Sequence, residues 1–236
     1  MSEAKWELTP IEEIDGVYVK RNDNYIIAGC NGGKAISAYQ IILDAKEQGY
    51  KDIITTGSRF SPQCEIVSCL CELEGLNAHI VMPGGAETEV MKKVKSNPRS
   101  ELLTPYKSGG YQSTLNAYCR KMADLKGYYL VPFGMQCEKN VHIVAKQCEN
   151  IPEHIKRIVV PVGSGMSLCG ILQGLVDFNR LDIEVVGVQT GGNPFKIIQA
   201  FKPKFVQLPK YRIESFMPDA DPSKGIILLP IIILVN

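Results

Sequence analysis

Residues 157–175, RIVVPVGSGMSLCGILQGL, show the fold class most clearly. Residues 157–162 are apolar and β-branched almost throughout, which predicts a strand covered on both faces of its sheet. The glycines of residues 163–165, Gly-Ser-Gly, follow at once and allow the backbone to turn tightly and to approach a ligand closely. Ser167 is predicted to cap a helix over residues 167–179. The segment therefore predicts a strand, a tight turn and a helix.

The turn at residues 163–167, GSGMS, is suited to bind a phosphate. The first N–H groups of a helix have no intrahelical acceptor, and the helix dipole is positive there. The hydroxyls of Ser164 and Ser167 would add to those N–H groups. The GxxxxGK[ST] phosphate loop is absent, and Leu168 stands where the dinucleotide-binding fingerprint has its third glycine. A tight turn without a ligand is the alternative that this motif leaves open.

Short apolar segments alternate with longer helical patterns along the whole chain. This alternation predicts βαβ units and an α/β fold with a mostly parallel sheet. Strands are expected at 17–20, 52–56, 79–82, 101–104, 128–131, 157–162, 184–189 and 204–207, and the apolar tail 225–235 is expected to be a buried strand. Helices are expected at 35–48, 62–74, 87–95, 112–126, 138–150, 167–179 and 194–201.

The composition excludes several classes of protein. The chain has 236 residues, of which 45% are hydrophobic and 22% charged, so it is not disordered. Its net charge of +1 gives no field that would attract nucleic acid or an anionic membrane. Its eight cysteines form no C-x-x-C pair, which disfavours a zinc site. Neither a signal peptide nor a membrane span is expected, so the predicted location is the cytoplasm.

Lys34 follows Asn31, Gly32 and Gly33 and precedes the expected helix 35–48. The helix dipole disfavours a positive charge at this end, and together with desolvation it would lower the pKa of the lysine. A neutral amine is what Schiff-base chemistry with an aldehyde requires. A surface lysine after a Gly-Gly turn is the alternative.

Ser61 and Pro62 stand at the expected start of another helix. Serine suits the capping position and proline the first helical position. The helix start could hold a substrate carboxylate through its backbone N–H groups and the Ser61 hydroxyl. The alternative is a well-capped structural helix.

In this order, the motifs resemble those of fold type II pyridoxal phosphate (PLP) enzymes, the tryptophan synthase beta-like superfamily. The most similar branch is that of aminocyclopropane carboxylate deaminase and D-cysteine desulfhydrase, and the resemblance covers about residues 9–189. It rests on Thr9-Pro10 with 19–23 (VKRND), 31–34 (NGGK), 57–63 (GSRFSPQ), 131–134 (VPFG) and 163–167 (GSGMS). The matching family segments are TP…VKRDD, GGNK, a loop followed by SNH, VPxGG and GSGGT.

The resemblance implies a three-layer α/β fold with helices on both faces of mostly parallel sheets, and PLP as cofactor. It implies that Lys34 forms the internal aldimine and acts as a base, with Ser61 as a second catalytic residue. The residues implied to bind the cofactor are Lys34, Gly163, Ser164, Gly165, Met166 and Ser167. Those implied to bind substrate are Ser58, Ser61, Gln63 and Gln136. No metal is expected.

The predicted function is that of a PLP-dependent lyase or deaminase, or a desulfhydrase, acting on a small amino acid as a homodimer. A larger cofactor-binding domain is expected at 1–42 plus 134–236, and a smaller domain at 43–133. Pro62 replaces an asparagine of the family and Met166 a glycine, and the chain ends at Asn236, before the region that completes the site in the family. These departures leave open a shortened, non-catalytic binding or interaction protein of the same fold.

Overall fold

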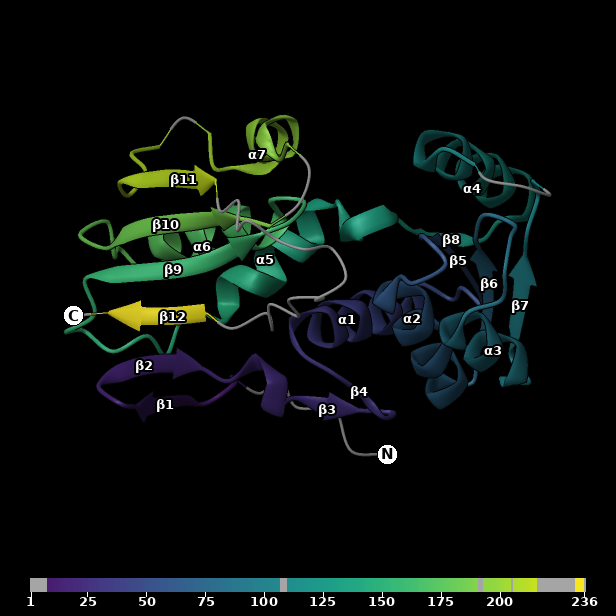
Figure 1. Cartoon of the computed structure of the whole chain (residues 1–236), viewed down its shortest axis with the longest axis horizontal. Helices are drawn as coiled ribbons and strands as arrows, with labels where there is room; N and C mark the ends of the chain where they lie inside the picture. The colour runs from purple at the N-terminus through teal and green to yellow at the C-terminus, as the bar shows by residue number, and fades with distance from the viewer. Residues whose placement is uncertain (1–7, 107–109, 191–192, 205, 216–231, 236) are drawn as a thin grey trace. The chain divides into compact units, whose positions relative to one another are not determined.

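The computed structural model describes residues 8–106, 110–190, 193–204, 206–215 and 232–235, and the chain divides into two compact units (Figure 1). One unit comprises residues 26–136, and the other comprises 1–25 together with 137–236. The predicted α/β class is confirmed. Each unit has its own sheet and its own helices.

The unit of residues 26–136 is built on a parallel sheet. Its described strands have the order β7-β6-β5-β8 and are all parallel. They are β5 (Asp52–Thr56), β6 (Asn77–Val81), β7 (Ser100–Leu103) and β8 (Tyr129–Val131). The helices are α1 (Gly33–Glu47), α2 (Pro62–Glu74), α3 (Glu89–Ser96) and α4 (Gln112–Lys126), with a short 3-10 turn at Phe133–Met135. An antiparallel ribbon of β3 (Ile26–Ile27) and β4 (Cys30–Asn31) precedes α1.

The β5 strand shows why this sheet is parallel and covered. Ile53, Ile54, Thr55 and Thr56 are all buried, as expected for a central strand with helices on both faces. The α2 helix that follows begins with Pro62 at its first position and ends at Gly75, which has a left-handed conformation. Local signals in the sequence therefore fix both ends of this helix.

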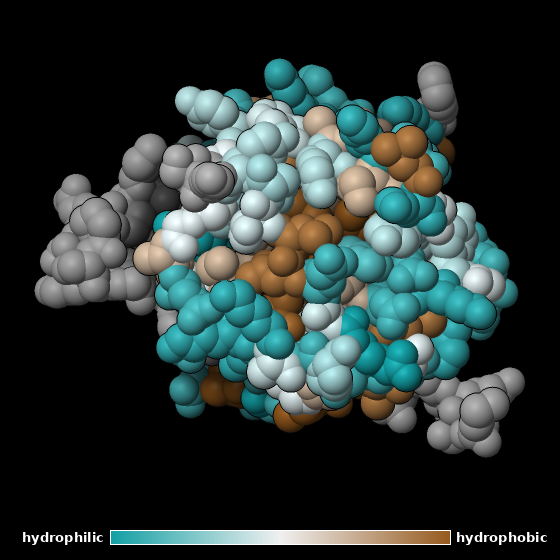
Figure 2. All heavy atoms as spheres, turned by 90° about the vertical axis from the view of Figure 1, so that its right-hand side faces the viewer, coloured by the Kyte–Doolittle hydropathy of each residue, from teal (hydrophilic) through white to brown (hydrophobic). Residues whose placement is uncertain are grey.

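Large hydrophobic side chains also reach the surface of this unit. Those more than half exposed are Ile26, Phe60, Leu73, Tyr111 and Leu125. Figure 2 shows hydrophobic side chains in the middle of the viewed face, with hydrophilic ones around them. Single exposed hydrophobic residues are normal on a soluble domain. Phe60 is notable because it precedes the predicted site residue Ser61.

The other unit contains a mixed sheet. Its described strands have the order β1-β2-β12-β9-β10-β11. They are β1 (Ile11–Ile14), β2 (Val17–Lys20), β9 (Arg157–Val162), β10 (Glu184–Gln189), β11 (Tyr211–Ser215) and β12 (Ile232–Val235). The helices are α5 (Glu138–Lys146), α6 (Met166–Asp177) and α7 (Phe195–Phe201), and a 3-10 turn spans Asn22–Asn24. Strands β9, β10 and β11 are parallel, whereas β12 is antiparallel to both of its neighbours.

The apolar tail forms an interior strand, as the sequence predicts. Strand β12 lies between β2 and β9, where Figure 1 draws it in yellow. Leu234 has no exposed surface and belongs to the core of this unit. The rest of the expected tail strand, residues 225–231, lies outside the described residues.

Two glycines allow α5 and α6 to pack closely. A Cβ at Gly170 would lie 2.4 Å from the Cβ of Val144, and one at Gly174 would lie 2.5 Å from the backbone oxygen of Ala145. Neither position therefore has room for a side chain unless the helices move apart. The buried face of α6 covers the strand β9, and this contact forms the core beneath the glycine-containing turn.

Most expected elements are present, and several have the predicted bounds. Strands 17–20, 52–56, 157–162 and 184–189 and helices 62–74 and 112–126 are confirmed as predicted. Other ends shift by a few residues, and α5 stops at Lys146 rather than at residue 150. The strand expected at 204–207 is wrong, since no strand is found at the described positions 204, 206 and 207. Prolines 203 and 209 flank that segment, and β11 pairs with β10 in its place.

The two units differ from the predicted domains at their first boundary. The prediction placed residues 26–42 with the region 134–236, but these residues belong to the unit of residues 26–136. The reason is that α1 packs against α2. The second boundary, after Gln136, is close to the predicted position.

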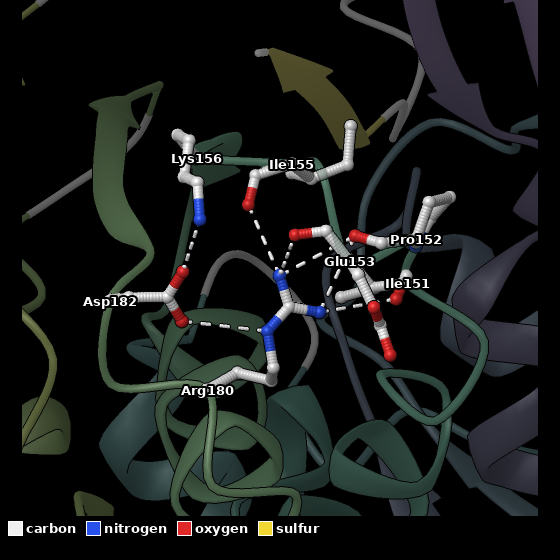
Figure 3. A network of polar contacts seen from close by, with 7 residues as sticks. All are labelled: Ile151, Pro152, Glu153, Ile155, Lys156, Arg180 and Asp182. Atoms are coloured by element: carbon white, nitrogen blue, oxygen red, sulfur yellow. Dashed lines mark hydrogen bonds and ion pairs between the residues drawn. The ribbon is translucent and has the colours of Figure 1, made fainter.

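Arg180 holds a loop of the second unit together (Figure 3). Its guanidinium donates to the backbone oxygens of Ile151 (3.2 Å), Pro152 (3.4 Å), Glu153 (3.1 Å) and Ile155 (3.1 Å). It also pairs with Asp182 at 3.5 Å, and Asp182 accepts from Lys156 at 2.7 Å. One side chain thus satisfies the carbonyl groups of the segment that leads into β9.

We expect Arg180→Ala to lower the free energy of unfolding by about 2 kcal/mol, because several carbonyl groups lose a charged donor. Urea unfolding followed by circular dichroism measures this loss. The matched control is Arg157→Ala, whose partner Glu184 forms a surface ion pair at 2.8 Å. That control should cost less than about 1 kcal/mol. Equal losses in the two variants would contradict the role given to Arg180.

Candidate functional site

Lys34 is the second residue of α1, which confirms its predicted place in the first helical turn. Gly32 precedes the helix with φ of +85°, a conformation that other residues rarely adopt. No described side chain caps this helix, and its first turn contains no acidic residue. Lys34 reaches solvent, yet desolvation by the surrounding protein lowers the pKa of its amine. The neutral, nucleophilic form is therefore more populated than in a free lysine.

Ser61 is the residue before α2, as predicted, but its hydroxyl does not cap the helix. The side chain lies over Gly57, where an added Cβ would be 2.5 Å from the Ser61 Oγ. The hydroxyl interacts with the thiol of Cys64. Ser58 is exposed, and its Oγ accepts from the Phe60 N–H at 3.3 Å. Because no described side chain caps α2, its first N–H groups are suited to an anion.

Gln63 is 2% exposed and joins α2 to the strand β5 and to the residue that follows β8. Its amide nitrogen donates to Thr55 Oγ1 and to the backbone oxygen of Pro132, both at 2.9 Å. Thr55 in turn donates to the backbone oxygen of Val131 at 2.8 Å. The two amide hydrogens are thus used inside the unit. The predicted contact of Gln63 with a substrate would have to use its carbonyl oxygen.

Gln136 lines a small cavity at the carboxyl ends of β5 and β8. The cavity has a volume of about 70 Å³, and Thr56, Asn116 and Arg120 also line it. The Thr56 hydroxyl is buried without an oxygen or nitrogen partner among the described residues, and it lies beside the Cys119 thiol. Open α/β sheets bind ligands at this edge. Thr56 was not among the residues predicted from the sequence to form the site. Its position, as a polar residue at the end of an apolar strand, is the feature that could have indicated it.

The turn at residues 163–167 has the form predicted from the sequence, with one correction. Ser167 is not the cap, because α6 begins at Met166 and Gly165 is the residue before it. Gly165 has φ of +100°, and a Cβ there would lie 2.9 Å from Ile198 Cγ1. This conformation starts the helix one residue earlier than predicted. Ser167 is exposed in its first turn.

The residues of this turn fit a phosphate group. No described atom lies within 4 Å of a Cβ built on Gly163, so the space above it is open. No described side chain caps α6, although Met166 N–H approaches Ser164 Oγ at 3.5 Å. Met166 is 3% exposed and packs into the core, so its side chain does not occupy the turn. The glycine that the family has at this position is therefore not needed to keep the turn open.

The first motif of the resemblance forms a buried polar cluster. Lys20 donates to the Thr9 backbone oxygen at 3.1 Å and to Asn150 Oδ1 at 2.7 Å. Thr9 also hydrogen-bonds with Asn22 at 2.7 Å and with Gln147. Burial lowers the pKa of Lys20 to about 8. Lys20 is only 1% exposed, however, so of the two lysines with lowered pKa among the described residues, Lys34 is the one that a cofactor can reach.

Comparisons with known proteins agree with these features. A model of the pyridoxal-phosphate dependent enzyme family matches residues 6–222. The chain belongs to this family. The predicted resemblance to fold type II PLP enzymes is confirmed, and family membership implies PLP as the cofactor.

One relative of this chain is the O-seryl-dTMP PLP-dependent decarboxylase of Salmonella phage ViI. The two are 26% identical over 211 residues, which cover 78% of this chain and 49% of the phage protein. The chain thus spans about half the length of that relative.

Two solved structures show the same fold. An ACC deaminase homologue has a TM-score of 0.66 at 23% identity, over 83% of this chain and 65% of its own. Diaminopropionate ammonia lyase from Escherichia coli has a TM-score of 0.61 at 16% identity, over 90% of this chain and 66% of its own.

The predicted site residues belong to both units. Lys34, Ser58, Ser61, Gln63 and Gln136 lie in the unit of residues 26–136, and the 163–167 turn lies in the other. Within the first unit, Ser61 and Gln63 stand at the start of one helix. Over the described parts of the chain, no three metal-binding side chains gather in one place, and no helix has the length and apolar character needed to cross a membrane.

Proposed function

We propose that this chain forms the catalytic part of a PLP-dependent lyase or deaminase that acts on a small amino acid. The observation that carries the proposal is Lys34, a solvent-accessible amine of lowered pKa at the start of α1. When bound, PLP supplies an electron-withdrawing ring that stabilises negative charge on the carbon beside the substrate amino group. The chain supplies the placement of the reacting groups and the transfer of protons.

Two parts of the chain would hold the cofactor. The Lys34 amine would bind its aldehyde end. The backbone N–H groups of the 163–167 turn would bind its phosphate, together with the hydroxyls of Ser164 and Ser167. The open space above Gly163 and the buried Met166 side chain support this assignment. Met166 would contribute only its backbone.

The substrate would be held at the start of α2. Its carboxylate would accept from the uncapped N–H groups of the first helical turn and from the Ser61 hydroxyl. Ser58, which is exposed close by in the chain, and Gln136 would contact the rest of the substrate. Lys34 Nζ would take the proton from the substrate carbon that bears the amino group, since its neutral form is accessible.

A second candidate is the decarboxylation of an amino acid attached to a nucleotide. It is favoured by the phage relative, whose name states that it acts on O-seryl-dTMP and whose identity extends over most of this chain. In that reaction the bond that breaks leads to the carboxyl carbon, so Lys34 would not need to remove a proton from the neighbouring carbon. The non-catalytic alternative rests on Pro62, which replaces the family's asparagine.

A spectrum of the purified protein with PLP is the first test. We expect a visible absorption band, and borohydride reduction should fix the cofactor to Lys34, as shown by peptide mass mapping. Fixation to a different lysine, or the absence of any band, would overturn the role of Lys34.

Product analysis then separates the candidate functions. Release of ammonia and a keto acid from D-cysteine, serine, threonine or aminocyclopropane carboxylate supports the lyase or deaminase. Release of carbon dioxide from O-seryl-dTMP alone supports the decarboxylase. Cofactor on Lys34 without any product from the whole panel supports the binding protein.

The homodimer and the cytoplasmic location expected from the sequence remain predictions. Light scattering of the purified chain in the presence and absence of PLP tests the first. Imaging of a fluorescent fusion in the source cell tests the second.

A further inference from the structure

Cys30 and Cys69 form a thiol pair in the unit of residues 26–136. Cys30 is in the ribbon strand β4, and Cys69 is in the middle of the helix α2. Both are free thiols, Cys30 being 7% exposed and Cys69 partly exposed. The Cys30 thiol hydrogen-bonds to the sulfur of Cys69. The fold thus brings together two sulfur atoms from distant parts of the sequence.

The pair is accessible from solvent. Both cysteines line a surface cavity of about 340 Å³, together with Glu65, Glu72 and Lys93. Lys93 pairs with Glu65 at 2.5 Å, whereas Glu72, which also lines the cavity, has no ion pair with another described residue. A molecule as small as a peroxide can therefore reach the sulfur atoms.

The two thiols have different acidities. The hydrogen bond from Cys30 lowers the pKa of Cys69 to about 7, with a smaller contribution from Lys93, while burial, Glu65 and Glu72 oppose the change. The pKa of Cys30 is raised, chiefly because its proton is held in the same hydrogen bond, and further by its burial. The hydrogen bond therefore favours the thiolate, which is the reactive form, on Cys69, the more exposed of the two.

We propose that Cys30 and Cys69 are a redox modification site that a peroxide converts to an intramolecular disulfide. The Cys69 thiolate attacks one oxygen of the peroxide, the O–O bond breaks, and hydroxide leaves, so that Cys69 becomes a sulfenic acid. The Cys30 sulfur then attacks the Cys69 sulfur, and the S–O bond breaks. The departing hydroxide takes the Cys30 proton and leaves as water. In total, two electrons pass from the two sulfur atoms to the peroxide. The hydroxide released in the first step takes up the proton that Cys69 lost when it ionised, so the peroxide yields two molecules of water.

This disulfide would restrain the segment that leads to Lys34. Cys30 is followed by Asn31 and then by the Gly32 turn from which α1 begins. A covalent bond from Cys30 to Cys69 would attach the start of this segment to the helix α2. The inference does not depend on the proposed function, because it concerns only the two sulfur atoms and an oxidant.

Mass spectrometry of the peroxide-treated protein tests the inference. After hydrogen peroxide treatment and blocking of the remaining thiols, we expect the mass to show the loss of two hydrogen atoms. Peptides containing Cys30 and Cys69 should be linked, and dithiothreitol should separate them. The rate of oxidation should rise as the pH increases through about 7, since the Cys69 thiolate forms in that range.

Three variants sharpen the test. In Cys30→Ser, Cys69 should stop at the sulfenic acid and react with dimedone. In Cys69→Ser, oxidation of Cys30 should be slower by about tenfold or more. The control Cys137→Ser removes a partly exposed thiol at the start of α5 and should form the disulfide as the wild type does.

Several results would overturn the proposal, all of them obtainable with the unsubstituted protein. They are the persistence of both thiols after peroxide treatment, a disulfide that links other cysteines or two chains, and oxidation of Cys69 to the sulfinic acid while Cys30 stays free.

Discussion

Lys34→Met is expected to abolish turnover and the visible absorption band of the protein with PLP. Methionine has about the length of lysine but no amine, so it can neither hold the aldehyde of the cofactor nor accept a proton. The loss of proton transfer alone lowers a rate by about 10²–10⁴-fold, and the loss of attachment adds to this. Spectra and product assays of wild type and variant under the same conditions measure the effect. This expectation rests on the proposed function.

The matched control for this prediction is Lys46→Met. Lys46 lies on the same helix, is exposed, and pairs with Glu74 at 2.8 Å. Removal of a surface ion pair costs at most about 1 kcal/mol, so band and turnover should be retained. If Lys34→Met still yields a protein with cofactor fixed by borohydride, a different lysine holds the cofactor and the proposed function loses its main support.

The parts of the fold that the sequence predicted well are those with strong local signals. The strand β9 is apolar after Arg157 and is followed by Gly163, and α2 lies between a Ser-Pro start and Gly75. In such segments the periodicity and the boundary residues agree, so the local pattern is sufficient. The central position of β12 was not predictable in the same way, because it depends on pairing with β2 and β9, which are distant in the sequence.

For the candidate site too, the features that have a local sequence signal could be predicted, and those that depend on packing could not. Lys34 and the 163–167 turn could be singled out, because glycine turns and helix starts are visible in the sequence. The direction of the Met166 side chain could not be predicted, since it depends on where α6 begins and on the core below it. The same is true of the Cys30–Cys69 contact, and of the Lys20 cluster, whose members come from the two separate chain segments of one unit.

Lys20 is expected to make the stability of the protein depend on pH in the alkaline range. Its side chain is 1% exposed, and its amine donates to Asn150 and to the Thr9 backbone, both of which are neutral acceptors. Burial therefore lowers the pKa of Lys20 from 10.5 to about 8. The neighbouring Cys148 does not compensate the charge, because burial raises the pKa of its thiol to about 12.

The sign of the effect follows from the protons bound in each state. Below about pH 8 both the folded and the unfolded states hold the proton, and the folded state bears the full cost of the buried charge. Between about pH 8 and 10.5 the unfolded state holds the proton and the folded state does not, so stability rises with pH. The difference between these two pKa values corresponds to about 3 kcal/mol.

The measurement is urea unfolding at a series of pH values, followed by circular dichroism, for wild type and Lys20→Met. The free energy of unfolding of the wild type, relative to that of the variant, should rise by up to about 3 kcal/mol across this range. Titration of the other groups is common to both proteins and cancels in the difference. Lys196→Met, at an exposed lysine of α7, should keep the wild-type rise. A Lys20→Met protein with the same pH dependence as the wild type would show that Lys20 keeps its charge at little cost, through water or through motion of the Thr9 segment.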